Sequence, residues 1–347
     1  MSTQIRNATQ SVRCLSSLLV RAPRKGQYAA TRATKRQKDL ARHSPLPWRR
    51  NILGIAVGEK STNREPIEGQ FCLKFFVREK LAKSRIPAGE MIPEVITLDS
   101  IETEVLTDLE RFPGIPIAQS DERVRPLRPG SSVGHYLGGT NGTLGLIVKR
   151  RGSDRPMILS CSHVLALGGR VDPDDPHENA IEQPADFDTE VGPNRVGRLS
   201  DKFTQIRVDA INQADAALAE IDDGLELSRS IPEIGEPKGV SQLFEEGVTR
   251  LSGVVVSRHG VKTGFQTGSL LSIEATFPIL YRVLGDRVAF FERLVLYKTI
   301  CAPGDSGAAV LDSQTKEVMG LHVAGTGDFG MFTPIQIVLD AVDADLF

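Results

Sequence analysis

The segment Gly304-Asp305-Ser306-Gly307 places a serine on a predicted tight turn. A serine nucleophile needs a base close to its hydroxyl, and it needs backbone N–H groups that converge where the substrate oxyanion forms. Flanking glycines permit such a turn and let another backbone approach closely. Ordinary turns use the same residue types, so the interpretation depends on a base and a carboxylate elsewhere in the chain.

His163 has the most suitable context for a base among the six histidines. The apolar run at 157–159 precedes it, followed by small residues, and apolar residues return at 164–166. This pattern predicts an imidazole at the end of a strand, where a general base can reach a neighbouring segment. The alternative is a histidine at the edge of the core that bonds only to backbone.

Two acids could orient that imidazole. Asp215 opens the otherwise apolar segment 214–221, and a buried acid in this position needs a partner, which His163 would supply. Asp209, between Val208 and Ala210, is the second candidate. Either acid could instead lie in solvent at the start of a strand.

The order His, Asp, Ser and the local sequences LSCSHVLA, ADAALAEI and APGDSGAAV resemble the trypsin- and chymotrypsin-like serine proteases. Four more segments resemble the narrow-leaf type of bacterial and plant peptidases: GTNGTLGLIVKRR, EQPADFD, RHGVKTGFQTGSL and GLHVAGTG. NILGIAVGEK and CLKFFVREKL resemble the domain that precedes the protease in that group. The resemblance runs from about residue 50 to the C-terminus, and its motifs are specific jointly rather than singly.

The resemblance implies a serine endopeptidase that acts on protein or peptide substrates without a metal or an organic cofactor. It makes Ser306 the nucleophile, His163 the general base and then acid, and Asp215 the residue that fixes the histidine tautomer. The backbone N–H groups of Gly304 and Ser306 would form the oxyanion hole. The alternative is a catalytically silent trypsin-like scaffold with a regulatory or binding role.

The resemblance also places a specificity pocket at His322, Val323, Ala324 and Gly325. GLHVAG is similar to the matching stretch of glutamyl endopeptidases and of picornaviral cysteine proteases. An imidazole there can donate to a carboxylate or an amide oxygen, which predicts a preference for Glu or Gln before the scissile bond. The alternative is a structural histidine packed under the pocket.

The sequence departs from the secreted trypsins at two points. Ser162 precedes the histidine with no disulfide cysteine after it, and no zymogen cleavage site is recognisable. Insertion of a new N-terminal amine beside Asp305 is therefore not expected. Asp305 should be held by backbone groups or by a basic side chain.

The elements that position these residues are predicted to be mainly β: a chymotrypsin-like double β-barrel, preceded by a small α/β domain and a basic N-terminal tail. Many short apolar runs separated by turn signals indicate a barrel or a sandwich, and the resemblance implies the chymotrypsin-like double barrel. The runs expected to form strands include Pro156–Leu159, Val208–Ala210, Thr249–Val256 and Val318–Ala324. The expected organisation is a tail at 1–49, an α/β module at 50–112, a Pro-rich linker at 113–130 and the protease domain at 131–347. Within the protease domain we expect barrel one at about 131–230, barrel two at about 245–335 and a C-terminal helix from residue 338.

Charge is uneven along the chain. Residues 1–50 hold twelve Lys or Arg and one acid, whereas the whole chain has a net charge of −2. A basic arm can bind nucleic acid, but a solvated tail is the preferred interpretation, and nucleic acid is not an expected partner. The four cysteines show no C-x-x-C spacing, and no apolar run is long enough to span a bilayer. These features predict a soluble cytoplasmic protein whose N-terminal module could bind a regulatory partner.

Overall fold

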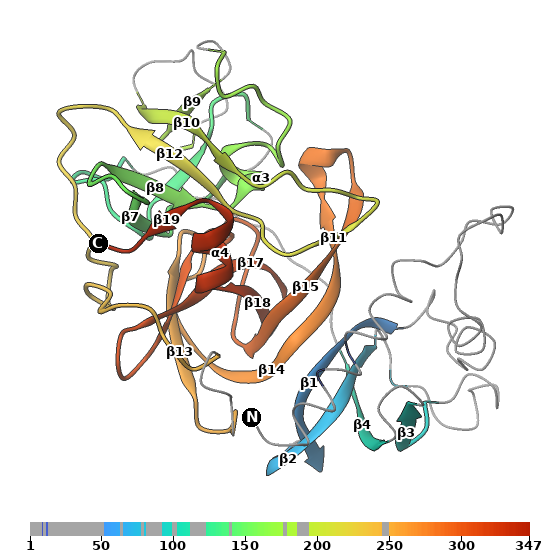
Figure 1. The fold of residues 1–347 in the computed structure, drawn as a ribbon. Coiled ribbons are helices and arrows are strands. Elements are labelled where there is room, and N and C mark those ends of the chain that lie inside the picture. Colours follow the sequence, from blue (N-terminus) through green and yellow to red (C-terminus); the bar gives the residue numbers. More distant parts are fainter. Residues whose placement is uncertain are drawn as a thin grey trace, which may run out of the picture.

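A computed structural model of the chain describes residues 9, 12, 52–62, 65–77, 80, 92–98, 103–111, 123–138, 141–175, 179–185, 194–244 and 250–347. The described part is mainly β, as the sequence predicts, and its strands form two sheets (Figure 1). The expected basic tail lies outside the described residues apart from positions 9 and 12.

The first sheet has eight strands in the order β19-β7-β8-β12-β10-β9-β5-β6. Their bounds are β5 (Ser132–His135), β6 (Asn141–Thr143), β7 (Leu146–Arg150), β8 (Pro156–Ser160), β9 (Ala180–Glu182), β10 (Arg195–Phe203), β12 (Ala217–Ile221) and β19 (Ala344–Asp345). β8 lies between β7 and β12, and helix α3 (Ser162–Leu165) follows it directly. β8, an inner strand of this sheet, thus leads into the segment that carries His163.

The second sheet has eleven strands in the order β11-β15-β18-β17-β16-β13-β14-β1-β2-β4-β3. Their bounds are β1 (Ile52–Thr62), β2 (Glu65–Val77), β3 (Val95–Leu98), β4 (Thr103–Arg111), β11 (Ile211–Asn212), β13 (Val255–Gly260), β14 (Gly264–Tyr281), β15 (Arg287–Lys298), β16 (Ala309–Asp312), β17 (Val318–Thr326) and β18 (Phe329–Pro334). The 3-10 turn η3 (Arg282–Leu284) joins β14 to β15, and helix α4 (Ile335–Ala341) follows β18.

The N-terminal strands are continuous with the second sheet. β1 pairs antiparallel with the middle of β14, with Ile55 opposite Thr276. The Phe277 ring covers Gly54, where a Cβ would lie 2.5 Å from the ring, and it packs against Phe76 with 5.1 Å between ring centroids. The described residues of 50–112 are strands with a parallel β2–β4 pair, and the helical part of the expected α/β module stays a prediction.

Three local expectations differ from the structure. The strand expected at 208–210 is a bend, and β11 begins only at Ile211. Position 249, where another strand was expected to begin, lies outside the described residues; over the described part this strand begins at Val255, after a turn at Gly253 with a φ of 87°. The terminal helix is α4, which ends at Ala341, so that the last residues can form β19 against β7.

Buried apolar side chains belong to both sheets. One cluster lies mainly on the first sheet and includes Leu146, Ile158 and Val164, and Val338 of α4 packs into the same cluster. A second cluster joins the N-terminal strands to the second sheet through residues such as Phe75. Burial of such side chains is the main stabilising term, so the N-terminal strands share the core of the second sheet.

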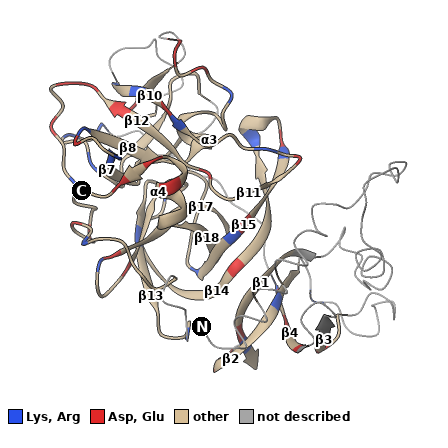
Figure 2. Cartoon of the chain, viewed as in Figure 1, with Lys and Arg blue, Asp and Glu red and all other residues tan. Residues whose placement is uncertain are grey.

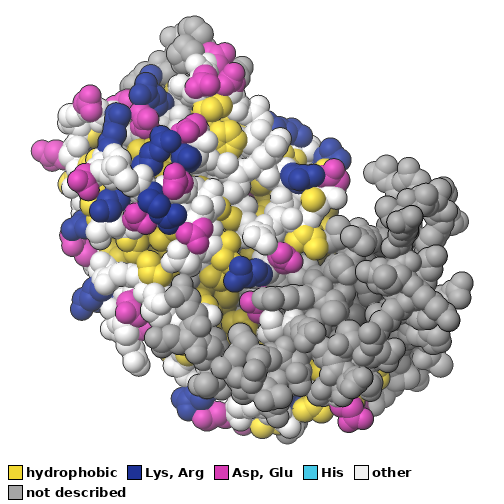
Figure 3. Space-filling model, viewed as in Figure 1, with side chains coloured by type: hydrophobic (Ala, Val, Ile, Leu, Met, Phe, Trp, Pro, Cys, Tyr) yellow, Lys and Arg dark blue, Asp and Glu magenta, His cyan; other side chains and the backbone are white. Residues whose placement is uncertain are grey.

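Charged side chains on the outside of the first sheet form ion pairs with their neighbours. Arg198 lies 2.6 Å from Glu220, and Arg195 lies 3.0 Å from Asp222 across β10 and its neighbours. Figure 3 shows basic and acidic side chains interspersed over this face, and Figure 2 marks the positions of these residues along the chain. Each exposed pair contributes little to stability. No helix among the described residues has the length and apolar content needed to cross a membrane.

Candidate active site

Helix α3 holds His163 just after the buried strand β8. Ser162 fixes the entry to this turn, because its hydroxyl donates to the Thr204 carbonyl at 2.6 Å. The His163 side chain is only 10% exposed. The strand-end position expected from the sequence is therefore found at the start of a short helical turn.

Asp215 lies directly beside His163. Its side chain is fully buried, and Oδ2 is 2.5 Å from His163 Nδ1. Its Oδ1 accepts a bond from the His163 backbone N–H at 3.0 Å. Asp209, the second candidate, is 77% exposed and pairs with Arg207 at 3.7 Å. The structure thus brings one of the two acids to the imidazole and leaves the other in solvent.

The turn that carries Ser306 packs against the first sheet. The Ser306 carbonyl accepts a bond from the Thr143 N–H at 2.8 Å, and the Gly304 carbonyl accepts one from the Thr143 hydroxyl at 2.8 Å. Gly142 fits between the turn and the residue after His163: a Cβ on Gly142 would lie 2.7 Å from the Ser306 carbonyl oxygen and would overlap Val164. The serine turn and the histidine segment are therefore neighbours across the two sheets.

The Ser306 hydroxyl donates to the Val323 carbonyl of β17 at 2.9 Å. Its single proton is thus shared with backbone in this conformation. Proton transfer to an imidazole would require the hydroxyl to turn away from that carbonyl. Hydrogen bonds of catalytic groups are often long or misaligned before substrate binds.

The turn that carries Ser306 has glycines with left-handed backbone angles on both sides of the serine. Gly304 has a φ of 109° and Gly307 a φ of 93°, a region that favours glycine. Across the described residues, neither the Gly304 N–H nor the Ser306 N–H donates to a backbone carbonyl, whereas the Asp305 N–H donates to Ala302. Two neighbouring N–H groups thus remain able to donate to a substrate oxyanion.

Asp305 is anchored by a buried arginine and by backbone groups. Arg258 Nη1 lies 3.1 Å from Asp305 Oδ2, and both side chains are fully buried. The carboxylate also accepts bonds from the N–H groups of Lys262 and Thr263 at 3.0 and 3.1 Å. Burial opposes the charge, but the Arg258 guanidinium, together with hydrogen bonds from the Ala302 N–H and the Thr263 hydroxyl, holds the pKa of Asp305 below its ordinary value. Asp305 is thus held both by a basic side chain and by backbone groups, the two kinds of partner expected from the sequence.

We expect Arg258→Met to destabilise the full chain by about 3–5 kcal/mol, because it leaves the Asp305 carboxylate buried without its counter-charge. Arg293→Met is the matched control, since Arg293 is 43% exposed and lies 3.9 Å from Glu274. It should cost less than about 1 kcal/mol. Urea denaturation followed by circular dichroism measures both. Equal losses would contradict the role of Arg258.

His322 lies on β17 with its side chain buried, and its Nδ1 is 2.9 Å from the Tyr297 hydroxyl. Burial and the charge of Arg258 lower the pKa of His322 to about 3, so the ring is neutral over the physiological range. Of the other predicted pocket residues, Val323 is buried, and Ala324 and Gly325 are partly exposed. These three continue β17 towards the surface.

The ligand atoms of Cys161, His163 and Asp215 lie within 4.8 Å of one another, a spacing that could suit a metal ion. Two observations oppose this use. His163 and Asp215 are already bonded to each other, and burial raises the pKa of the Cys161 thiol well above its ordinary value. The protonated thiol bonds to the His322 carbonyl, and a neutral thiol is a poor metal ligand.

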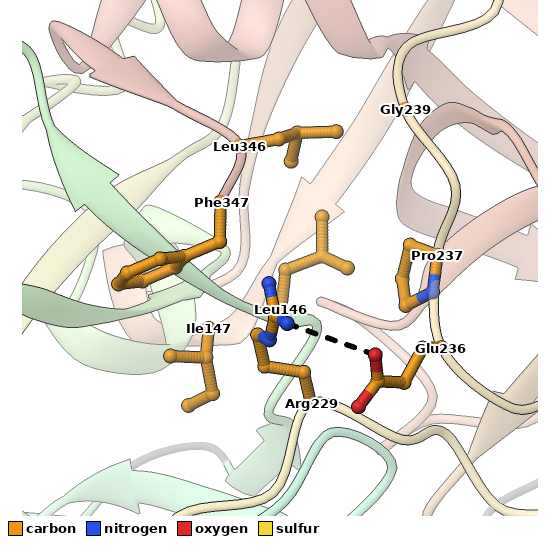
Figure 4. A pocket seen from close by; sticks show the side chains of 8 residues that line it. All are labelled: Leu146, Ile147, Arg229, Glu236, Pro237, Gly239, Leu346 and Phe347. Atoms are coloured by element: carbon orange, nitrogen blue, oxygen red, sulfur yellow. Dashed lines mark ion pairs between the residues drawn. The ribbon is translucent and has the colours of Figure 1, made fainter.

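A separate surface pocket lies away from these residues (Figure 4). It is lined by Leu146, Ile147, Arg229, Glu236, Pro237, Gly239, Leu346 and Phe347, and an Arg229–Glu236 ion pair at 3.7 Å lies at its side. None of the candidate catalytic residues contributes to it.

Sequence reasoning missed three residues that contact the site: Arg258, Tyr281 and Tyr297. Arg258 and Tyr297 lie within short β patterns, where nothing in the local sequence marks a buried partner. Tyr281 closes β14 and donates to Asp215 across 66 positions of sequence. Only the pairing of distant strands brings these side chains to the site.

No protein-family model matches the sequence, and no curated protein matches it. Among solved structures, protease A of Thermobifida fusca matches with a TM-score of 0.43 and 15% identity, covering 63% of this chain and 98% of that one. A glutamic acid-specific serine protease described as using a histidine triad in substrate binding matches with a TM-score of 0.43 and 16% identity, over 64% and 100% of the two chains. The HtrA-type protease AlgW matches with a TM-score of 0.33 and 16% identity, over 58% and 51%. At this level of likeness, chemistry can be assigned to this chain only from its own side chains.

Proposed function

We propose that this chain is a serine endopeptidase that cleaves peptide bonds through an acyl-enzyme. The observation that carries the proposal is the buried His163–Asp215 pair beside a glycine-flanked serine turn. Nothing in the reaction calls for a group outside the chain, because the base, the nucleophile and the anion site are all side-chain or backbone groups.

In the first half of the reaction, Ser306 Oγ attacks the carbonyl carbon of the scissile bond while His163 takes the hydroxyl proton. The N–H groups of Gly304 and Ser306 stabilise the oxyanion that develops. His163 then gives its proton to the leaving amine as the C–N bond breaks. Asp215 accepts from Nδ1 throughout, so that Nε2 of the ring faces the reacting groups in the correct tautomer.

In the second half, water replaces the amine. His163 takes a proton from the water as its oxygen attacks the acyl carbon, and it returns the proton to Ser306 Oγ when the ester bond breaks. The carboxylic acid product then leaves, and the enzyme returns to its starting state.

We further propose that the pocket beside His322 prefers Glu or Gln before the scissile bond. The neutral His322 ring can accept the Tyr297 proton at Nδ1, which leaves its other nitrogen as a donor. A donor in a buried pocket favours a side chain with a carboxylate or amide oxygen and rejects one without it, because the donor would otherwise stay unpaired.

The test is digestion of a peptide library by the purified full-length chain, with the cleavage sites read by mass spectrometry. We expect Glu or Gln before most cleaved bonds, and His322→Leu should lower kcat/KM for such substrates by about 100-fold. His259→Gln is the control, since His259 bonds to Glu233 at 2.6 Å and, as the neighbour of Arg258 on β13, points to the other face of that strand. Cleavage mainly after Arg, Lys or large apolar residues would contradict the preference but leave the proposed hydrolysis intact.

A further inference from the structure

The Asp215 carboxylate has a third hydrogen-bond donor that the proposed reaction does not use. The Tyr281 hydroxyl lies 3.0 Å from Asp215 Oδ2, the oxygen that also bonds to His163 Nδ1. A carboxylate oxygen has two lone pairs, so both donors can be accommodated at once. With the His163 N–H on Oδ1, the carboxylate is held at three points.

Tyr281 is also in contact with the imidazole itself. The two rings meet edge to face, with 5.4 Å between their centroids and 67° between their planes. Its own ring is held in turn by Phe291 of β15, at 5.8 Å between centroids. A single side chain of the second sheet therefore touches both members of the His163–Asp215 pair, which come from the first.

The phenol is restricted to the role of donor. Tyr281 is 3% exposed, and burial together with the Asp215 charge raises its pKa well above the ordinary value. The group is therefore protonated at any working pH. A carboxylate offers no proton in return, so the Tyr281 hydroxyl proton points at Oδ2.

The backbone that carries Tyr281 is fixed from both sides. Tyr281 is the last residue of β14 and stands opposite Arg287 of β15. Four residues earlier, Phe277 packs on the N-terminal strands at Gly54 and Phe76. The Tyr281 hydroxyl is thus held in position by well-packed strands. A hydrogen bond of defined geometry to Asp215 requires such support.

We propose that Tyr281 is a positioning residue that orients the Asp215 carboxylate, and through it the His163 ring, across the boundary between the two sheets. The proposal rests on the peptidase function argued above. Its effect should appear in kcat rather than in KM, because Tyr281 acts on the catalytic pair and not on the substrate.

The experiment uses Tyr281→Phe in the full-length chain, which removes the hydroxyl and keeps the ring. We expect kcat to fall at least about tenfold with KM within about twofold, since a hydrogen bond to a charged group is lost. The proton shared by His163 and Asp215 is expected to give a proton NMR signal far downfield of the amides, and loss of the signal in His163→Ala would assign it. This signal should move in Tyr281→Phe and stay in place in Tyr297→Phe, which removes a buried hydroxyl that bonds to His322 instead.

Tyr281→Leu removes the aromatic ring as well as the hydroxyl, so comparison with Tyr281→Phe separates the contribution of the ring from that of the hydroxyl. If Tyr281→Phe leaves both kcat and the downfield signal unchanged, the proposal is overturned, and a large effect of Tyr281→Leu alone would assign Tyr281 to packing. A moved signal in a chain without hydrolytic activity would support the contact and refute the peptidase function. Urea denaturation of each variant, with a midpoint close to that of the wild type, excludes unfolding as the cause.

Discussion

Ser306→Ala is expected to abolish both peptide hydrolysis and labelling by a fluorophosphonate. Loss of a serine nucleophile costs about 10⁶-fold in kcat in serine peptidases, because only oxyanion stabilisation and substrate binding remain. The reagent forms a covalent bond only with an activated serine, so it reports an assembled site without a known substrate. The measurement is intact mass and peptide mapping of wild type and variant after treatment.

Ser153→Ala is the control for this experiment, because Ser153 lies in the exposed turn between β7 and β8. It should label and hydrolyse like the wild type. A label on a residue other than Ser306 would refute the assignment of the nucleophile. A folded wild type that neither labels nor cleaves any peptide of the library would favour the silent scaffold, in which the Ser306 hydroxyl stays on the Val323 carbonyl.

Asp215→Asn is expected to lower kcat by about 10⁴-fold with little change in KM. The amide keeps the shape of the carboxylate, but it offers a donor as well as an acceptor to the His163 ring, and the imidazolium loses its counter-charge. The histidine then adopts the wrong tautomer for accepting the serine proton. Steady-state kinetics on the best library peptide gives the kcat and KM values.

Asp209→Asn makes the same chemical change six residues earlier in the chain. Asp209 is exposed and pairs only with Arg207 among its described partners, so the change should leave kcat within about twofold. If the two substitutions had the same effect, the identity of the carboxylate in the catalytic pair would be refuted. The sequence ranked Asp215 first and Asp209 second, and the structure buries the Asp215 side chain and exposes that of Asp209.

The sequence predicted the inner strands well because they are continuous apolar runs that both sheets must bury. The run expected at Pro156–Leu159 is β8, and the one expected at Val318–Ala324 lies within β17. β8 leads directly into the turn that carries His163, and β17 carries His322, so their local patterns were sufficient to place one side chain just after a strand and the other inside a sheet.

Contacts between distant strands could not be predicted in the same way. Arg258 reads locally as a polar residue of an alternating strand, yet it is fully buried because Asp305 returns to it 47 residues later. Tyr281 meets Asp215 only because the end of β14 reaches the first sheet. The periodicity of apolar residues predicts which face of a strand a side chain lies on. It does not predict which distant residue that side chain contacts.

The pairing of β1 with β14 has a consequence for any attempt to study residues 131–347 alone. Without β1, the backbone N–H and C=O groups of Ser272–Thr276 would form an open edge. Such an edge is a template for the addition of other extended chains and for aggregation. The N-terminal strands therefore protect this edge. A shortened chain would need a bound strand, a charged substitution or a proline there to resist such addition.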